Sequence, residues 1–299
     1  MENKYKQAYD TVLKYGQEHL LAFYDELNDE EKEFLLNQIL NTDFELVERL
    51  YKSAGQEADI TMEDIIEPVA YTDKLSLSQE SLDSYAQCGN MLMKNGCFAA
   101  VTMAGGQGTR LGHNGPKGKF DIGLPTHESL FAIQCRRLLE QSKICGKTIP
   151  WYIMTSREND SATRTFFDDN NYFGYDKSCI MFFVQSMLPM INFDGKIVLE
   201  SKGKIKEGAD GHGGLFAAMV KNGVYDDMKS RGVKWIFVGG IDNVLLKLCD
   251  SVFLGFVEKS GCGIGAKSLV KRDAKEKVGV FCKMNGKPYV IEYTEVSDE

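Results

Sequence analysis

"CFAAVTMAGGQGTRLG", residues 97–112, joins a short apolar run to a turn that contains three glycines. The apolar run over residues 97–103, bounded by glycine, predicts a buried strand. Gly105, Gly106 and Gly108 permit positive φ angles and let a ligand come close to the backbone. Free amides in such a loop favour phosphate. The stretch therefore predicts a strand that ends in an anion-binding loop.

Cations follow the glycines. Arg110 offers a planar guanidinium for phosphate oxygens, and Lys117 offers a mobile point charge. Two common phosphate motifs are absent, because G-x-x-x-x-G-K-[ST] does not match and G-x-G-x-x-G, started at Gly106, meets Leu111 instead of glycine. A P-loop NTPase and an NAD-binding domain are therefore disfavoured. A plain strand and turn with basic neighbours is the alternative interpretation.

Strand and helix patterns alternate from residue 97 onward. The alternation predicts an α/β, Rossmann-like fold with a mixed, mainly parallel sheet and helices on both faces, and ligands at the carboxyl ends of the strands. Strands are expected at 150–156, 178–185 and 233–243, with further candidates at 261–270, 277–284 and 288–296, and helices at 127–147, 158–170 and 214–232.

The first part of the chain has a helical pattern. Tyr5, Tyr9, Val12 and Leu20 recur at spacings that place them on one helix face, and Asn28 is a candidate helix cap. Residues 53–73 have weak periodicity and are expected to form a connector, after which a helix resumes. We predict two domains, a helical N-terminal region over 1–74 and a nucleotidyltransferase domain over 75–299.

Composition narrows the class of protein. The net charge of −8 argues against broad nucleic-acid binding, and 43% hydrophobic residues describe an ordinary globular chain. None of the eight cysteines forms a C-x-x-C pair, which fits a reducing compartment better than a disulfide framework or zinc site. The start has no apolar signal segment, and no run is long enough for a membrane span. We expect a cytoplasmic protein without nucleic-acid or membrane partners.

Several polar residues follow predicted strands. Asp242 could supply the hard oxygen ligand that a metal needs, or it could form an ordinary turn with Asn243, and the pattern alone does not separate the two. The turn "EGADGHGGL", residues 207–215, exposes backbone at its glycines. Glu292 lies on one face of a strand candidate, where a solvent-facing role is equally open. Gln185 at a strand end carries no assignment by itself.

The ordered motifs resemble the eukaryotic-type UDP-sugar pyrophosphorylase family, most of all its UDP-N-acetylglucosamine pyrophosphorylase branch. The resemblance begins with "AGGQGTRLG…PKG" and covers about residue 97 to the end. It continues through "WYIMTS", "MLPMINFDGKIVLE", "DGHGGL", "DNVLLK" and "VGVFCKMNGKPYVIEYTEVS".

The resemblance implies uridylyl transfer from UTP to a sugar 1-phosphate, with pyrophosphate as the second product. Such a reaction needs in-line positioning and positive charge, not a general base. The catalytic roles would fall on Arg110 and Lys117, with Asp242 holding Mg²⁺. The nucleotide would be bound by Met103, Ala104, Gly105, Gly106, Lys117, Gln185, Gly211 and Asp242. The sugar would be bound by His212, Gly279, Glu292 and Tyr293.

Two departures keep alternatives open. The family's N-acetylglucosamine enzymes are expected to carry asparagine at position 212, whereas histidine is familiar in the UDP-glucose type. A UDP-glucose or broad UDP-sugar pyrophosphorylase is therefore the alternative enzyme. The resemblance also implies that the family's C-terminal part, with a further sugar-binding segment and lysine, is missing from these residues. A non-catalytic UTP-binding fragment is the second alternative, and the oligomeric state stays open.

Overall fold

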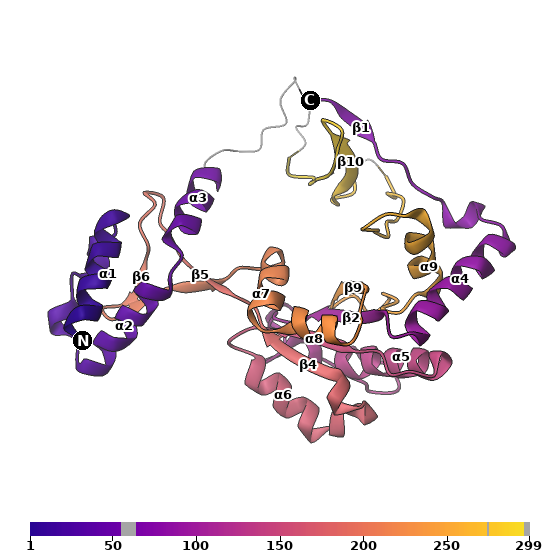
Figure 1. The fold of residues 1–299 in the computed structure, drawn as a ribbon, viewed down its shortest axis with the longest axis horizontal. Helices are drawn as coiled ribbons and strands as arrows, with labels where there is room; N and C mark the ends of the chain where they lie inside the picture. The colour runs from indigo at the N-terminus through magenta and orange to yellow at the C-terminus, as the bar shows by residue number, and fades with distance from the viewer. Residues whose placement is uncertain (55–63, 274, 296–299) are drawn as a thin grey trace. The chain divides into compact units, whose positions relative to one another are not determined.

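The computed structural model describes residues 1–54, 64–273 and 275–295, and its chain divides into two compact units (Figure 1). Unit 1 contains residues 1–77, 188–207 and 266–299. Unit 2 contains residues 78–187 and 208–265. The boundary that we predict between residues 74 and 75 divides the chain by function, and it stays a prediction.

A four-stranded parallel sheet forms the centre of unit 2, with the strand order β4-β3-β2-β9. The strands are parallel because a helical connection returns the chain to the end of the sheet at which the previous strand began. The strands are β2 (Phe98–Met103), β3 (Trp151–Thr155), β4 (Ile180–Val184) and β9 (Trp235–Gly240). The helices are α4 (Gln79–Lys94), α5 (Leu130–Cys145), α6 (Asp160–Asp169), α7 (Leu215–Lys221), α8 (Val224–Ser230) and α9 (Ser251–Ser260).

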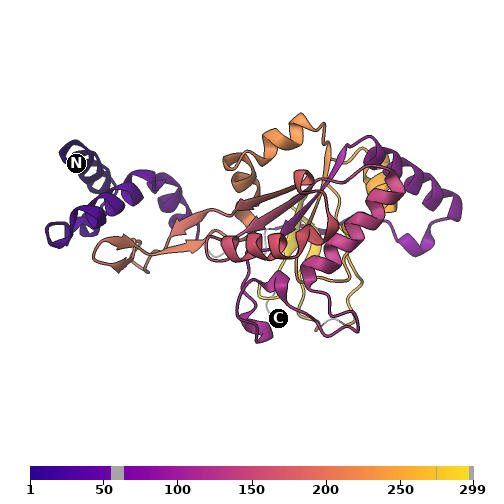
Figure 2. The ribbon, with the colours of Figure 1, turned by 90° about the horizontal axis from the view of Figure 1, so that it is seen from below.

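Helices cover both faces of this sheet, as Figure 2 shows with α7 and α8 on one side and α5 and α6 on the other. Alternate residues of β2 enter different cores. Phe98 and Ala100 pack with α5 and α6, whereas Ala99 and Val101 pack with α7 and α8. Burial on both faces explains why the strand is apolar at every position except Thr102, and does not alternate between apolar and polar residues.

Unit 1 has a helical core of its own. In it, α1 (Glu2–Lys14), α2 (Asp29–Asn41) and α3 (Phe44–Ala54) pack with a hairpin made of β6 (Leu199–Ser201) and β7 (Lys204–Ile205). Asn28 caps α2 in a reciprocal capping box with Glu31. Ile197 and Ile205 of the hairpin segment are buried among the helices. The N-terminal helical prediction is therefore confirmed, except that α1 ends at Lys14 and Leu20 lies in a separate 3-10 turn, Glu18–Leu21.

The same unit contains a small antiparallel sheet with the order β1-β10-β11. Its strands are β1 (Ile66–Pro68), β10 (Val280–Met284) and β11 (Lys287–Ile291). The pair β5 (Met187–Pro189) and β8 (Glu207–Ala209) forms another two-stranded sheet. In the described chain, no helix is long and apolar enough to cross a membrane.

The α/β fold with a parallel sheet is confirmed, and three local predictions need correction. Residues 261–270 form no strand, and Leu269 and Val270 are almost fully exposed because no neighbouring strand pairs with them. The expected helix over 214–232 is two helices, which Gly223 separates with φ at 73°. The expected connector contains β1, while its residues 55–63 lie outside the described residues.

Candidate nucleotide site

Three segments of unit 2 meet where the parallel strands end. The glycine loop, residues 104–108, follows β2, Gln185 follows β4, and Asp242 follows β9. Register pairs Met103 with both Met154 and Gly240, so these strand ends lie side by side. The fold thus assembles the predicted loop, amide and carboxylate at one edge, where parallel sheets bind ligands.

The glycine loop presents free amides. Among the hydrogen bonds of the described residues, neither Gly105 nor Gly106 donates its backbone N–H. Met103 and Ala104 differ, because the Met103 carbonyl accepts from Ile241 and the Ala104 N–H donates to Met154. Their backbone groups therefore fix the loop to the sheet. The two glycine amides are the donors left for an anion.

Lys117 and Asp242 form an ion pair beside this loop. Lys117 begins a short 3-10 turn, Lys117–Lys119, and its N–H donates to the Gly106 carbonyl at 3.1 Å. Its Nζ lies 3.1 Å from Oδ2 of Asp242. Partial burial would raise the pKa of Asp242, but the hydrogen bond and charge of Lys117 outweigh it and lower the pKa. Asp242 is therefore ionised at neutral pH.

Gln185 lies against the glycine loop. A Cβ added at Gly105 would stand 2.9 Å from Oε1 of Gln185. The side-chain amide of Gln185 can therefore keep its position only while residue 105 is glycine. Gln185 is buried, and its backbone N–H donates to Thr155. Within the described residues its side-chain amide makes no hydrogen bond. An amide whose donor and acceptor atoms have no protein partner can recognise a group such as a pyrimidine edge.

Asn159, which the sequence analysis missed, clamps the glycine loop. It is fully buried at the start of α6. Its side-chain nitrogen donates to the Ala104 carbonyl at 3.0 Å and the Gly106 carbonyl at 3.4 Å, and its oxygen accepts from Ser156 N–H at 2.8 Å. With these carbonyls held inward, the neighbouring loop amides stay available. Its only sequence signal was an asparagine at a helix start just after a strand.

Gln134 joins the ends of two strands and was also missed. From α5 its Oε1 accepts from the Thr102 hydroxyl at 3.0 Å, and its nitrogen donates to the Gly240 carbonyl at 3.3 Å. Thr102 in turn accepts from the Trp151 indole at 2.8 Å. This buried network fixes the strand ends that carry the glycine loop and Asp242. A glutamine inside an amphipathic helix pattern gave no signal of it.

The second glycine turn carries Asp210, Gly211 and His212. Gly211 has φ 70° and ψ −160°, a backbone conformation that other residues avoid. The carboxylate of Asp210 packs on Gly214, and burial raises its pKa. Its Oδ1 is buried without a hydrogen-bond partner among the described residues. His212 is exposed, and its electrostatic interaction with Asp242 is the smallest of the contributions to the lowered pKa of that carboxyl group.

The remaining predicted residues divide by unit. Gly279, Glu292 and Tyr293 belong to unit 1. Gly279 and Glu292 are neighbours there, since a Cβ at Gly279 would lie 3.2 Å from Oε1 of Glu292. Tyr293 is exposed. Arg110 lies in the 3-10 turn Thr109–Leu111 of unit 2, and its side chain is outside what the structure describes.

The side chains at this site suit a metal ion that arrives bound to the phosphates of a ligand. Across the described residues, no group of three or more His, Cys, Asp or Glu side chains could hold an ion by itself. Asp242 supplies a carboxylate beside the glycine loop. Mg²⁺ is commonly held by one or two carboxylates together with substrate phosphates. A carboxylate beside a phosphate-type loop therefore suits a hard divalent metal such as Mg²⁺, whereas a zinc cage needs three or more protein ligands.

Comparison with known proteins gives the family. Residues 40–299 match the sequence model of the family described as UTP–glucose-1-phosphate uridylyltransferase. The chain belongs to this family. It is 37% identical over 300 residues to UDP-N-acetylhexosamine pyrophosphorylase-like protein 1 of Xenopus tropicalis, which covers 95% of this chain and 58% of that protein. It is 36% identical to UDP-N-acetylglucosamine diphosphorylase 1 of Arabidopsis thaliana, over 99% of this chain and 62% of that protein.

Solved structures agree with the sequence comparison. The UDP-N-acetylglucosamine pyrophosphorylase of Trypanosoma brucei, solved with an inhibitor, is 28% identical with a TM-score of 0.82, and the match covers 99% of this chain and 62% of that one. A related protein of Entamoeba histolytica has a TM-score of 0.72 at 33% identity over 78% of this chain and 60% of that one. The resemblance to UDP-sugar pyrophosphorylases is confirmed, and the chain spans about three fifths of these relatives' length.

Proposed function

We propose that the protein transfers a uridylyl group from UTP to N-acetylglucosamine 1-phosphate. A phosphate oxygen of the sugar forms a bond to the α-phosphorus of UTP, the bond from that phosphorus to the β-phosphate oxygen breaks, and pyrophosphate leaves. The attacking oxygen is already anionic, so no proton needs to be removed. The observation that carries the proposal is the Lys117–Asp242 ion pair, 3.1 Å apart, beside the free amides of Gly105 and Gly106.

Each group at this edge has a role in the proposal. The amides of Gly105 and Gly106, with Arg110 and Lys117, neutralise the triphosphate. Gln185 pairs with the uracil edge, and Met103 and Ala104 form the strand end below it. Gly211 lets its turn approach the nucleotide, since its backbone is open to no other residue type. These contacts orient the α-phosphorus for in-line attack.

The Lys117–Asp242 pair must open when substrate binds. In the structure each charge neutralises the other. Asp242 would hold Mg²⁺, which when bound would supply positive charge to the phosphate oxygens. Lys117 would then turn to a phosphate. The pair keeps both side chains near their working positions at low cost, since a partly exposed ion pair contributes on the order of 1 kcal/mol.

The sugar is proposed to be read by His212, Gly279, Glu292 and Tyr293. A carboxylate such as Glu292 can accept two hydroxyl hydrogen bonds. N-Acetylglucosamine 1-phosphate is favoured because relatives at 36% and 42% identity, from Arabidopsis thaliana and Saccharomyces cerevisiae, are named for that sugar. Glucose 1-phosphate is the second candidate, and His212 is the observation that favours it. We also propose a cytoplasmic setting, with UTP and sugar phosphate as the partners.

A panel of sugar 1-phosphates tests the proposal. The protein is incubated with UTP, Mg²⁺ and either N-acetylglucosamine or glucose 1-phosphate, and released pyrophosphate is measured. We expect the highest kcat/KM with N-acetylglucosamine 1-phosphate. A preference for glucose 1-phosphate would support the second candidate. UTP binding without pyrophosphate from any sugar, in both this chain and a longer natural version, would contradict uridylyl transfer.

A further inference from the structure

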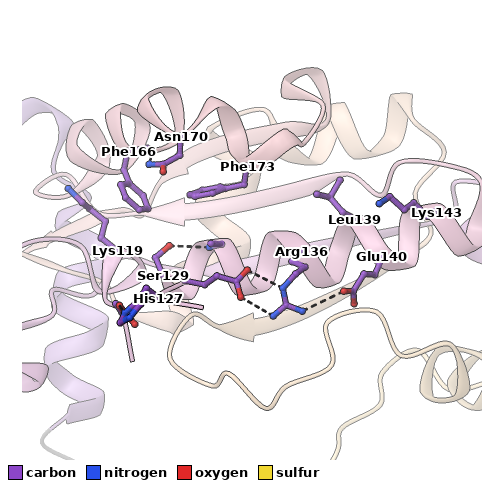
Figure 3. A pocket seen from close by; sticks show the side chains of 13 residues that line it. Lys119, His127, Ser129, Arg136, Leu139, Glu140, Lys143, Phe166, Asn170 and Phe173 are labelled. Carbon is purple, nitrogen blue, oxygen red and sulfur yellow. Dashed lines mark hydrogen bonds and ion pairs between the residues drawn. The ribbon is translucent and has the colours of Figure 1, made fainter. Parts of the chain in front are cut away.

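Unit 2 also contains a groove whose lining residues differ from those of the candidate nucleotide site. It is a groove of about 790 Å³ along the outer side of α5, facing α6 and the segment that follows α6 (Figure 3). We call it the α5 groove, and its lining includes Lys119, Ser129, Leu139, Lys143, Phe166 and Phe173. None of the residues assigned above to UTP or sugar lines it. We propose that the α5 groove binds a small aromatic anion.

The floor of the groove suits a flat ring. Phe166 and Phe173 are half-buried, with ring centroids 5.7 Å apart and planes inclined at 59°. The two rings therefore form an angled apolar corner in which a third ring can pack edge-to-face or offset. Leu139 of α5 extends the apolar surface from the opposite side, as Figure 3 shows. Apolar walls with a few polar groups are typical of small-molecule sites.

The carboxylates of the groove are already engaged. Arg136 contacts both oxygens of Glu128, at 3.0 and 3.2 Å, and also Glu140 at 3.5 Å. Hydrogen bonding to Arg136 holds the pKa of Glu128 below its usual value, so it stays an anion. Asp121 accepts from Gly123 N–H and contacts the ring of His127. Arg136 thus balances one of the two glutamate charges, and the Asp121 carboxylate is held by its own hydrogen bonds.

Two lysines remain without a carboxylate. Among the described residues, neither Lys119 nor Lys143 makes an ion pair, and Lys119 instead stands over the Phe166 ring at 5.2 Å. Figure 3 places them toward opposite ends of the groove, with the phenylalanines between. A cation at either end of an aromatic floor is complementary to a ring that carries a phosphate or carboxylate.

The volume favours a small molecule over a peptide. Small-ligand pockets span about 300–1,000 Å³, and the groove falls inside this range. The occupant is therefore an aromatic ring with an anionic group, which can come from a nucleoside monophosphate or from a simple aryl phosphate. Lys119 lies in the same short turn as Lys117, and the intervening Gly118 packs on the ring of Phe131. A ligand on Lys119 thus contacts the turn that begins with Lys117.

Binding measured by calorimetry on the full chain tests the proposal. The probes are 1-naphthyl phosphate and adenosine 5′-monophosphate, with uncharged 1-naphthol for comparison. Variants Lys119→Gln and Lys143→Gln each remove one groove cation, and Lys229→Gln is the matched control on the exposed surface of α8. Circular dichroism verifies that each variant is folded. The variant Asp242→Asn tests whether a probe binds at the candidate nucleotide site and not in the groove.

We expect at least one phosphate probe to bind at a single saturable site and more tightly than 1-naphthol. Lys119→Gln and Lys143→Gln should each weaken it about fivefold, the upper range for an exposed charge pair. Lys229→Gln and Asp242→Asn should leave it unchanged. Binding of adenosine monophosphate would identify a nucleotide source, and binding of naphthyl phosphate alone would identify a simple aryl phosphate. The proposal is overturned if neither probe binds saturably, or if both lysine variants bind the probe as tightly as the natural protein does.

Discussion

Asn159 shows how one buried side chain prepares the glycine loop for a ligand. Its amide turns two loop carbonyls toward the protein interior. The adjoining glycine amides then remain without internal partners. An anion can use these donors without first breaking a hydrogen bond, which is the advantage of a preorganised loop.

Replacing Asn159 by Asp should damage both the fold and the loop. The carboxylate would face the carbonyls of Ala104 and Gly106, and both would lose a donor. Leaving buried polar groups unsatisfied costs about 1–3 kcal/mol each. We expect urea unfolding to show a loss of at least about 2 kcal/mol in the free energy of unfolding. Asn171→Asp, at an exposed position, is the control. Equal stability of the Asn159→Asp and control variants would contradict the clamp.

Gly105→Ala should affect ligand binding more than stability. The new Cβ would stand 2.9 Å from Oε1 of Gln185, and the flexible end of that side chain must move. Overpacking of this kind costs about 1–3 kcal/mol. We expect UTP affinity, measured by calorimetry, to fall at least about fivefold. Gly263→Ala, where a Cβ meets open space, is the matched control. If Gly105→Ala bound UTP normally, Gln185 would not be a recognition residue.

At the scale of elements, side chains tie α8 to the sheet from which the site projects. The hydroxyl of Tyr152, on β3, donates to Asp227 of α8 at 2.7 Å. Arg231 donates to the same carboxylate at 2.7 Å. Partial burial would raise the pKa of Asp227, but the hydrogen bonds from Arg231 and Tyr152 outweigh it and hold the pKa below 3.8. The contact therefore depends on an ionised carboxylate.

Tyr152→Phe should cost about 1 kcal/mol at pH 7, the usual net value of one hydrogen bond. Because the folded-state pKa of Asp227 is lowered, its stabilising contribution is present above the usual pKa of 3.8 and is lost as pH falls through the lowered pKa. The difference in the free energy of unfolding between Tyr152→Phe and the natural protein should become smaller over that pH range. Urea unfolding at neutral and acidic pH measures it. A pH-independent difference would contradict the account, and Tyr225→Phe on the exposed face of α8 is the control.

Sequence reasoning succeeded where one local signal controls an element. The strand at residues 97–103 was predictable, because buried parallel strands are apolar runs. The roles proposed for Gln185 and Asp242 came from the family resemblance and not from the strand pattern. Sequence reasoning failed at residues 261–270, which have apolar residues but no neighbouring strand to pair with. Asn159 and Gln134 were missed because their roles depend on contacts with distant backbone carbonyls.

At the scale of the whole molecule, each unit has its own buried core. The candidate nucleotide site uses residues of unit 2 from segments that lie up to about 140 positions apart in the chain, since Met103 and Asp242 both belong to it. Folding of the α/β core is therefore required before any of these groups can act together. Ligands that bind only the folded state stabilise it by mass action.

UTP should raise the thermal stability of the protein, and more so with Mg²⁺. A ligand at about 100 times its dissociation constant adds about 2.7 kcal/mol. We expect the melting temperature, measured by calorimetry, to rise with UTP and Mg²⁺ and to rise less when EDTA removes the metal. In the Asp242→Asn variant, UTP should raise the melting temperature by the same amount with Mg²⁺ as with EDTA. The same rise with and without Mg²⁺ in the natural protein would contradict a metal role for Asp242.

The central claim is that Lys117 neutralises a phosphate of UTP. Titration calorimetry of the chain with UTP in Mg²⁺ tests it most directly, comparing the natural protein with Lys117→Ala and with Lys229→Ala as the surface control. A charge-assisted hydrogen bond contributes about 1.5–3 kcal/mol, so Lys117→Ala should bind UTP about tenfold to a hundredfold more weakly while the control binds normally. Equal UTP affinity in Lys117→Ala and the natural protein would contradict the account.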